Sequence, residues 1–361
     1  MKIGIVLHPY GEKYPAGLAR IIFEWTKALV ASDMKNEYTI FTKERSVPAD
    51  VFSGGRLRAA ALGGGRFWLD RGLSRMREAD VIIFNTPVLP FFGKPKRSIV
   101  IALDFAYQYI PAYSLVDWAK KFTLKWYHGY SLRRADAVIA ISDATKNDCA
   151  RLYGIPKGKI TVIHPGFTDI CALPQKPVDV PKPFFLFIGA LKERKNVHGV
   201  IGAFAEYRRR NPASREMLCI AGSGAGEYRG SLRMLAEKEG ISPHICFLGP
   251  VSDRELSFLY KNTVALVFPS FIEGFGFPIL EAMACGTPVI TSRGSSSEEI
   301  ARDAALLVDP KNINEIAGAM QKITNDGSLR DSLVRAGNGR VAQFSWSKAA
   351  KELLKVIENT R

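Results

Sequence analysis

Short apolar runs alternate with helical segments along almost the whole chain, and this alternation constrains the fold more than any other feature. In the first half the runs are rich in Val and Ile and lie at residues 2–8, 37–42, 79–85, 97–104, 135–142 and 159–166. Runs that are apolar on both faces are typical of strands in a parallel sheet that helices cover on both sides. The first half is therefore predicted to be an α/β domain.

The same alternation starts again near residue 183. The strand-like runs of the second half lie at residues 183–191, 216–224, 244–251, 263–270 and 288–292, and helical segments separate them. Between the halves, four prolines fall within ten residues: Pro174, Pro177, Pro181 and Pro183. This composition is typical of a linker. Two successive α/β halves predict two facing Rossmann-like domains with parallel sheets and an interdomain cleft.

The domain boundaries follow from these segments. We assign residues 1–170 to an N-terminal domain, 171–183 to the linker, 184–340 to a C-terminal domain and 341–361 to a terminal amphipathic helix. The sequence leaves open whether this helix crosses back to the N-terminal domain. A total of 361 residues agrees with two domains of ordinary size.

Composition narrows the class of protein. The most apolar window, residues 81–92, is interrupted by Asn85, Pro87 and Pro90, so we expect no transmembrane helix. The first residues are strand-like and too short for a signal peptide, which favours a cytoplasmic location. The five cysteines are odd in number and widely spaced, and most lie in apolar runs, so we expect buried reduced thiols.

The net charge of +15 indicates an anionic partner. Residues 1–170 hold 25 Lys and Arg against 15 Asp and Glu, so most of the excess lies in the first half. A phosphorylated substrate, an acidic membrane surface and nucleic acid are all anionic partners consistent with this net positive charge. Nucleic acid is the weakest of the three, because the basic residues are dispersed and no recognition module is present.

The stretch EGFGFPILE at residues 273–281 places two carboxylates eight positions apart. Glu273 is predicted on a glycine-containing loop after a parallel strand, where ligands bind in open α/β sheets. Glu281 is predicted in the first turn of a helix that begins at Pro278. The backbone amides of residues 274–277 could then donate to phosphate or sugar oxygens. Alternatively, Glu281 only favours the helix dipole and Glu273 is solvated.

The stretches FPSFIEGFGFPILEAMACGTPVITS, FIGALKERKNV and RRADAVIAISDATKNDCARLYGIPKGKITVIHPGF resemble the family-4 retaining glycosyltransferases. Their signature is E-x7-E within a GT-B fold. The resemblance implies that Glu273 contacts the donor sugar and that Glu281 contacts the ribose of the nucleotide. It also implies that Arg194 and Lys195 bind the diphosphate leaving group, where positive charge assists bond breaking. The same resemblance assigns the donor sugar and phosphate to the amides of Gly274, Phe275, Gly276 and Phe277.

Further donor-site residues follow from the same resemblance. They are Gly17 in PAGLAR, Gly222 in AGSGAG, Pro250, Val251 and Ser252 in FLGPVS, and Glu299 in SSSEEIA. Three positions depart from the family pattern. Ala16 replaces the usual Gly neighbour of Gly17. Leu103 precedes Asp104 where relatives carry His, so Asp104 is expected to take a larger catalytic role, or the acceptor contacts differ. Ala190 stands where many relatives carry Arg.

The resemblance also implies a reaction. The IGALKERKN form is similar to a mannosyltransferase-like subgroup, which favours GDP-mannose as donor, with a UDP-sugar as the alternative. The acceptor would be a saccharide or a polyprenyl-diphosphate-linked saccharide of cell-surface polysaccharide or lipopolysaccharide synthesis. No D-x-D motif is present, so we expect transfer without a metal ion or another cofactor. A sugar-nucleotide epimerase would share the fold.

The segment 118–134, WAKKFTLKWYHGYSLRR, interleaves aromatic and basic residues. This composition is typical of a helix that lies on an anionic membrane surface. It predicts a peripheral protein at the inner face of the plasma membrane. In the alternative interpretation, the aromatic side chains pack on the domain core and only the lysines are exposed. The sequence does not indicate an oligomeric state.

Overall fold

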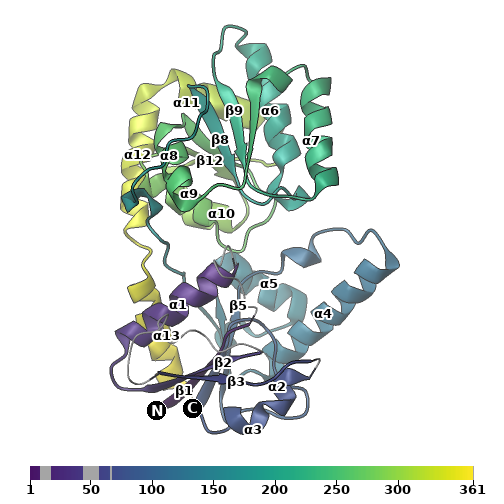
Figure 1. Cartoon of the computed structure of the whole chain (residues 1–361), viewed down its shortest axis with the longest axis vertical. Coiled ribbons are helices and arrows are strands. Elements are labelled where there is room, and N and C mark those ends of the chain that lie inside the picture. Colours follow the sequence, from purple (N-terminus) through teal and green to yellow (C-terminus); the bar gives the residue numbers. More distant parts are fainter. Residues whose placement is uncertain (9–17, 44–56, 66, 361) are drawn as a thin grey trace. The chain divides into compact units, whose positions relative to one another are not determined.

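The computed structural model describes residues 1–8, 18–43, 57–65 and 67–360. The chain forms two compact units, which are described separately (Figure 1). The first comprises Met1–Gly166 together with Phe344–Arg361, and the second comprises Phe167–Gln343.

A seven-stranded parallel sheet, in the order β3-β2-β1-β4-β5-β6-β7, forms the centre of the first unit. Its strands are β1 (Lys2–Val6), β2 (Glu37–Thr42), β3 (Leu57–Ala61), β4 (Val81–Phe84), β5 (Ser98–Ala102), β6 (Ala137–Ala140) and β7 (Ile160–Val162). In the register of β1 with β2, Ile3 lies opposite Tyr38. The residues of β4 and β5 are all buried, because helices cover both faces of the sheet.

A six-stranded parallel sheet, in the order β10-β9-β8-β11-β12-β13, forms the centre of the second unit. Its strands are β8 (Phe184–Ile188), β9 (Met217–Ala221), β10 (Ile245–Gly249), β11 (Ala265–Phe268), β12 (Val289–Ser292) and β13 (Leu306–Val308). Phe184 lies opposite Met217 in the register of β8 with β9. The prediction of two Rossmann-like domains with parallel sheets is confirmed.

The helices follow the strands in alternation. Those of the first unit are α1 (Leu18–Ser32), α2 (Trp68–Arg71), α3 (Leu73–Met76), α4 (Leu115–Arg134), α5 (Asp143–Tyr153) and α13 (Trp346–Asn359). Those of the second unit are α6 (Val197–Arg210), α7 (Gly226–Lys238), α8 (Asp253–Asn262), α9 (Phe277–Ala284), α10 (Ser296–Ala301), α11 (Ile313–Asn325) and α12 (Gly327–Val341). Short 3-10 turns include η2 (Ala106–Gln108), η4 (Ile170–Ala172) and η5 (Glu193–Lys195).

Two strands were not predicted from the sequence, β3 and β13. Strand β3, LRAAA, is an edge strand that is nowhere fully buried. Ala and Arg have little preference for a pleated, half-buried surface, so the segment carries no strand signal. Strand β13 has three residues, too few to show a period.

The terminal helix α13 belongs to the first unit and packs against α1. Figure 1 shows the yellow C-terminal helix beside the purple N-terminal one. Ser345 caps α13 by accepting a hydrogen bond from the amide of Lys348, 3.2 Å away. The buried residues Ala349, Ala350, Leu353 and Ile357 form one apolar stripe, which is the face that packs.

The Pro-rich segment is attached to the second unit. Lys176 donates its backbone N–H to the carbonyl of Arg254 at 3.1 Å, and its Nζ forms an ion pair with Glu255 at 2.8 Å. The Arg254 guanidinium donates to the carbonyl of Pro174 at 3.0 Å. The chain therefore passes between the units at residues 166–167, before the prolines, and again at residues 343–344.

Candidate active site

Glu273, Arg194 and Lys195 lie together at the carboxyl edge of the second sheet. Glu273 lies on the loop that follows β11, and the two basic residues lie in η5, in the loop that follows β8. Strands β8 and β11 are neighbours in the sheet, so the two loops leave it side by side. The backbone N–H of Phe271 donates to the carbonyl of Arg194 at 2.9 Å and joins the loops directly.

The three side chains form a charge cluster. Lys195 Nζ lies 2.5 Å from Glu273 Oε1, and an Arg194 guanidinium nitrogen lies 3.4 Å from Glu273 Oε2. The side chains of Lys195 and Glu273 are only 10% and 8% exposed, and that of Arg194 is 23% exposed. Lys195 Nζ also lies 4.9 Å from the ring centre of Phe268. The cluster holds two cations for one carboxylate, so it can attract an anion while every buried charge keeps a partner.

Glu281 faces a different partner. Its Oε2 accepts a hydrogen bond from the hydroxyl of Tyr260 at 3.2 Å. Burial of Tyr260 and the charge of Glu281 raise the pKa of the Tyr260 phenol well above its usual range. The phenol therefore stays protonated and donates to the carboxylate across the whole physiological pH range.

The expected place of Glu281 in its helix needs correction. Helix α9 begins at Phe277, and Pro278 occupies its first turn at the second position. Glu281 is thus the fifth residue and lies beyond the first turn, which holds no acidic residue. The helix starts early because Gly276 adopts φ of 118°, a left-handed conformation that a side chain would strain. The dipole interpretation of Glu281 is weakened accordingly, because that effect falls off within one turn.

Gly274, Phe275 and Gly276 are buried, and Phe277 is half-buried. Phe275 and Phe277 pack with ring centres 5.0 Å apart. The hydroxyl of Ser296 donates to the carbonyl of Glu273 at 2.7 Å. This hydrogen bond from α10 therefore fixes the loop that carries Glu273.

Other residues of the predicted donor site have structural contacts of their own. A Cβ added to Gly222 would lie 1.8 Å from the carbonyl oxygen of Gly189, so close backbone approach alone requires a glycine there. Ser252 caps α8 in a reciprocal capping box with Glu255. Pro250 and Val251 precede this cap and follow β10. Glu299 lies in α10, and its carbonyl accepts from the guanidinium of Arg340 at 2.8 Å.

The first unit contains the remaining predicted residues. Asp104 follows β5, and its Oδ1 accepts from the backbone N–H of Ala106 at 3.1 Å. The neighbouring Leu103 side chain is buried in the core, so it makes no polar contact of the kind that a histidine would make. Gly17 lies outside the described residues.

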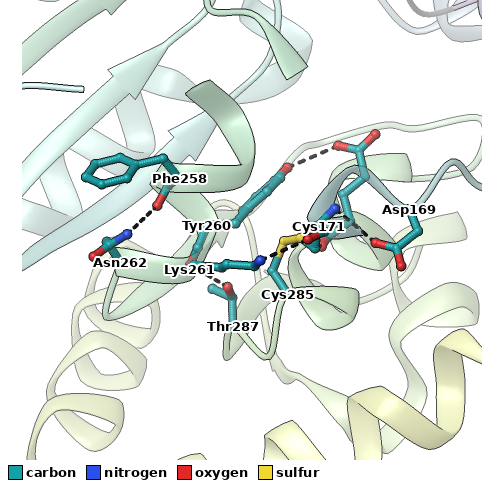
Figure 2. Close-up of a disulfide and its surroundings, with 9 residues drawn as sticks. Asp169, Cys171, Phe258, Tyr260, Lys261, Asn262, Cys285 and Thr287 are labelled. Atoms are coloured by element: carbon teal, nitrogen blue, oxygen red, sulfur yellow. Dashed lines mark hydrogen bonds between the residues drawn. A yellow bond between two sulfur atoms is a disulfide. The ribbon is translucent and has the colours of Figure 1, made fainter. Parts of the chain in front are cut away.

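The cysteine prediction is wrong at two positions. Cys171 and Cys285 form a disulfide with a Cα–Cα distance of 5.4 Å (Figure 2). Cys171 lies in η4 and Cys285 caps the C-terminal end of α9, one turn after Glu281. The two residues are 114 positions apart, so their spacing gave no sign of pairing. Cys149, Cys219 and Cys246 are free, as expected.

Four residues of the site were not predicted. Tyr260 contacts Glu281, while Asn196, Ser292 and Ser296 donate to backbone carbonyls of the β11 loop and its neighbours. An Asn directly after the basic pair was the only available signal. Ser296 lies in the quoted stretch SSSEEIA and Ser292 ends the predicted strand at residues 288–292, but nothing in the sequence shows which carbonyl either serine reaches.

Within residues 1–8, 18–43, 57–65 and 67–360, no three His, Cys, Asp or Glu side chains lie together as metal ligands. Across the same residues, no helix has the length and apolar character needed to cross a bilayer.

Comparison with known proteins gives the family. A model of "Glycosyltransferase Family 4" matches residues 15–169, and one of "Glycosyl transferases group 1" matches residues 172–340. The chain is 31% identical over 297 residues to O-antigen chain mannosyltransferase B of Escherichia coli, covering 77% of this chain and 74% of that protein. It is 29% identical over 225 residues to O-antigen chain mannosyltransferase RfbU of Salmonella typhimurium, covering 60% and 61%.

Solved structures give the fold. The structure of Anabaena Alr3699/HepE in complex with UDP and glucose superposes with a TM-score of 0.75 at 17% identity, over 99% of this chain and 100% of that one. The resemblance noted in the sequence is confirmed, and the chain belongs to glycosyltransferase family 4, with the GT-B fold.

Proposed function

We propose that the chain transfers a hexose, namely mannose from GDP-mannose, to a saccharide acceptor with retention of configuration. The observation that carries this proposal is the pairing of Lys195 and Arg194 with Glu273 at the carboxyl edge of the second sheet. Such a cluster offers positive charge to a diphosphate and a carboxylate to sugar hydroxyls within one small volume.

Lys195 and Arg194 would stabilise the leaving group. When the bond between the sugar and the diphosphate breaks, negative charge grows on the diphosphate oxygens. Donors fixed beforehand at that position lower the barrier, typically by about 3–4 kcal/mol for each strong donor. Arg presents a planar fork and Lys a compact charge, so the two would bind different oxygens of the diphosphate.

The two glutamates would divide the rest of the donor. Glu273 would accept hydroxyl hydrogens of the sugar, and Glu281, oriented by Tyr260, would accept those of the ribose. The amides of Gly274, Phe275, Gly276 and Phe277 would donate to sugar and phosphate oxygens. Gly222, Pro250, Val251, Ser252 and Glu299 would line the nucleotide side.

The first unit would bind the acceptor, with Asp104 as its polar catalytic contact and Gly17 near the donor phosphate. We assign no protein nucleophile. The acceptor hydroxyl would attack on the face from which the diphosphate leaves, and the donor phosphate would take its proton. In this mechanism Arg194 and Lys195 supply the charge that a metal ion would otherwise supply. Transfer should persist in EDTA, and a tenfold loss would contradict this assignment.

Mannose as the transferred sugar is supported by the names of the two O-antigen mannosyltransferases to which the chain is similar, and GDP as its carrier by the IGALKERKN form noted in the sequence. A UDP-sugar is the alternative, since Alr3699/HepE was solved with UDP. Thermal-shift measurements with GDP-, UDP- and ADP-sugars distinguish these donors, because only a ligand that binds the folded state raises its melting temperature. Stabilisation by UDP-sugars alone would contradict the GDP-mannose assignment.

The names of the same two relatives, which refer to the O-antigen chain, support the proposed acceptor class. We infer a saccharide, free or linked to polyprenyl diphosphate, in cell-surface polysaccharide or lipopolysaccharide synthesis. Radiolabelled mannose should enter a product only when such an acceptor is added, and that product should be lipid-extractable when the acceptor is linked to polyprenyl diphosphate. Release of donor sugar at the same rate without acceptor would instead favour an epimerase or a hydrolase.

Helix α4 supports a peripheral membrane location. Trp118, Phe122 and Trp126 are 59%, 60% and 53% exposed, although they are large and apolar. Tyr127 and Tyr130 instead pack inward and donate to the carbonyls of Leu89 and Phe91 at 2.8 Å and 3.0 Å. The alternative in which the aromatic residues pack on the core thus holds for the two tyrosines and fails for the other three. With Lys120 and Lys125 exposed beside them, these rings suit an anionic bilayer surface better than nucleic acid.

Vesicle flotation tests this location. The protein should float with vesicles containing phosphatidylglycerol and much less with pure phosphatidylcholine. A variant with Trp118→Ser, Phe122→Ser and Trp126→Ser should lose flotation, whereas Met234→Ser, at an exposed methionine of α7, should keep it. Equal flotation of both variants would show that α4 is not the contact.

A further inference from the structure

Asn196 has an unusual backbone conformation directly after the basic pair. Its φ and ψ are 56° and 38°, in the left-handed region, and it separates η5 from α6. Asparagine tolerates this region better than most residues, but the conformation still persists only where its surroundings hold it. The residue is 5% exposed, so its side-chain amide requires partners inside the protein.

The side-chain amide of Asn196 joins three loops. Its Nδ2 donates to the carbonyl of Pro269 at 3.0 Å and to that of Pro310 at 2.6 Å. Pro269 begins the loop that carries Glu273, and Pro310 lies in the connection from β13 to α11. One side chain therefore fixes the loop of the two cations to the loop of the carboxylate.

Gly199 provides the space for this side chain. It lies in the first turn of α6, and a Cβ at this position would lie 2.3 Å from Asn196 Oδ1 and 2.7 Å from its Nδ2. An alanine at residue 199 would therefore displace the amide from Pro269 and Pro310. The arrangement can thus be disturbed without changing Asn196 itself.

We propose that Asn196 is a positioning residue for the transfer reaction, which holds Lys195 and Arg194 in place against Glu273. This inference rests on the proposed function, in which the two cations bind the diphosphate. Lys195 Nζ lies 2.5 Å from Glu273, and its backbone is adjacent to Asn196, so a shift of the loop alters this distance directly. A misplacement of about 1 Å at such a group can cost about 10²-fold in rate.

The test compares Asn196→Gly with Asn211→Gly. Glycine at residue 196 accepts the left-handed backbone and removes both hydrogen bonds. Asn211 ends the same helix and also donates its amide to a backbone carbonyl, that of Tyr207 at 2.8 Å. We expect Asn196→Gly to lower kcat for mannosyl transfer by about 10²-fold, and Asn211→Gly to leave kcat within about twofold at a matched fraction of folded protein. Gly199→Ala should act like Asn196→Gly, although alanine favours the helix.

A double mutant separates positioning from general destabilisation. If Asn196 acts through Lys195, Asn196→Gly should cost little further activity in a Lys195→Ala background. Full additivity of the two losses, or an unchanged kcat in Asn196→Gly, would overturn the proposal while leaving the transferase function intact.

A second measurement needs no ligand. Lys195 should be protected from acetylation by an N-hydroxysuccinimide ester in the wild type and in Asn211→Gly, and reactive in Asn196→Gly and Gly199→Ala. Protection that is unchanged in the last two variants would overturn the proposal. If the wild type bound neither GDP nor UDP in calorimetry, the proposed function would fail, and the acetylation result would still decide whether Asn196 holds the cluster.

Discussion

The charge cluster of the second unit and helix α4 of the first unit are both rich in cations, but the cations are nearly buried in the cluster and exposed on α4. In the cluster, the side chains of Lys195 and Glu273 are almost buried and lie 2.5 Å apart. On α4, Lys120 and Lys125 are exposed beside exposed aromatic rings. Buried charges depend on a partner at a fixed position, whereas exposed charges act additively and are screened by salt.

This contrast has a consequence for mutation. In the cluster, replacing Glu273 removes the carboxylate that both Lys195 and Arg194 contact, at a cost of about 3–5 kcal/mol where such a pair is fully buried. A single change on α4 removes one of several similar contacts, each worth about 1 kcal/mol or less. The cluster should therefore be sensitive to single substitutions, and α4 only to grouped ones.

The largest effect is expected from the cluster itself. Lys195→Ala should lower kcat for transfer by about 10³-fold, because it removes one donor to the leaving group, and should weaken GDP binding as well. Glu273→Ala should lower transfer equally but keep the GDP affinity within about threefold, since both cations are still present to bind the diphosphate. Steady-state kinetics and calorimetry measure the two quantities. Equal losses of GDP affinity in both variants would contradict the division of roles.

The second-largest effect is expected from ionic strength, which should weaken membrane binding by α4 much more than donor binding by the charge cluster. Raising NaCl from about 0.05 M to 0.5 M shortens the screening length to a few ångströms. Flotation with anionic vesicles should fall by at least about tenfold, whereas the KM for donor should rise only about threefold, because nearly buried charges are screened less. Flotation that is insensitive to salt would show that the α4 surface binds through its aromatic residues alone.

Glu281 should have an intermediate effect. Glu281→Ala should weaken GDP and UDP binding by about tenfold, the value of one or two hydrogen bonds to a charged group, with a smaller change in kcat. Tyr260→Phe should reproduce part of this loss, because the phenol orients the carboxylate from 3.2 Å. If Tyr260→Phe had no effect on affinity while Glu281→Ala had the full effect, Glu281 would be oriented by other contacts.

The disulfide should affect stability more than activity. Cys285→Ser should lower the melting temperature of the second unit by about 5–10 °C without reductant, from a typical 2–4 kcal/mol for a long loop. Dithiothreitol should abolish the difference, and Cys246→Ser, at a free half-buried cysteine, should show none. Thiol titration of the denatured wild type should find the three free cysteines. Five titrated thiols would show that the pair is reduced.

The smallest effect concerns His128 on α4. Burial lowers the pKa of its imidazole to about 4, below the unfolded value of about 6.5. Between these values the unfolded chain binds more protons than the folded one, so stability falls as the pH drops from about 6.5 to 4. His128→Gln should make the melting temperature of the first unit less dependent on pH in that window. The same slope in both proteins would show that other groups cause it.

Local patterns explain why much of the architecture could be predicted. The apolar runs identified in the sequence contain strands β1, β2, β4–β7 and β8–β12. Periodicity and turn residues act over about a dozen positions, so one sequence displays them. Edge strand β3 was not predicted, because its residues are partly exposed and therefore show no apolar pattern in the sequence.

The site was predictable only in part. Glu273, Lys195 and Arg194 were found through a family pattern, and the structure brings all three together. The start of α9 was misplaced by one residue, since the left-handed Gly276 permits an earlier first turn. Tyr260 and Asn196 act on residues 21 and 73 positions away, and no local signal reports such a contact.

The sequence by itself determined two α/β halves and the residue types available at the carboxyl edge of the second sheet. Only the tertiary structure decided that Cys171 pairs with Cys285, that α13 packs on α1, and which aromatic residues of α4 stay exposed. The physical reason is the separation along the chain over which each interaction acts. Secondary structure depends on neighbours along the chain, whereas pairing, burial and exposure depend on which distant segments the packed core brings into contact.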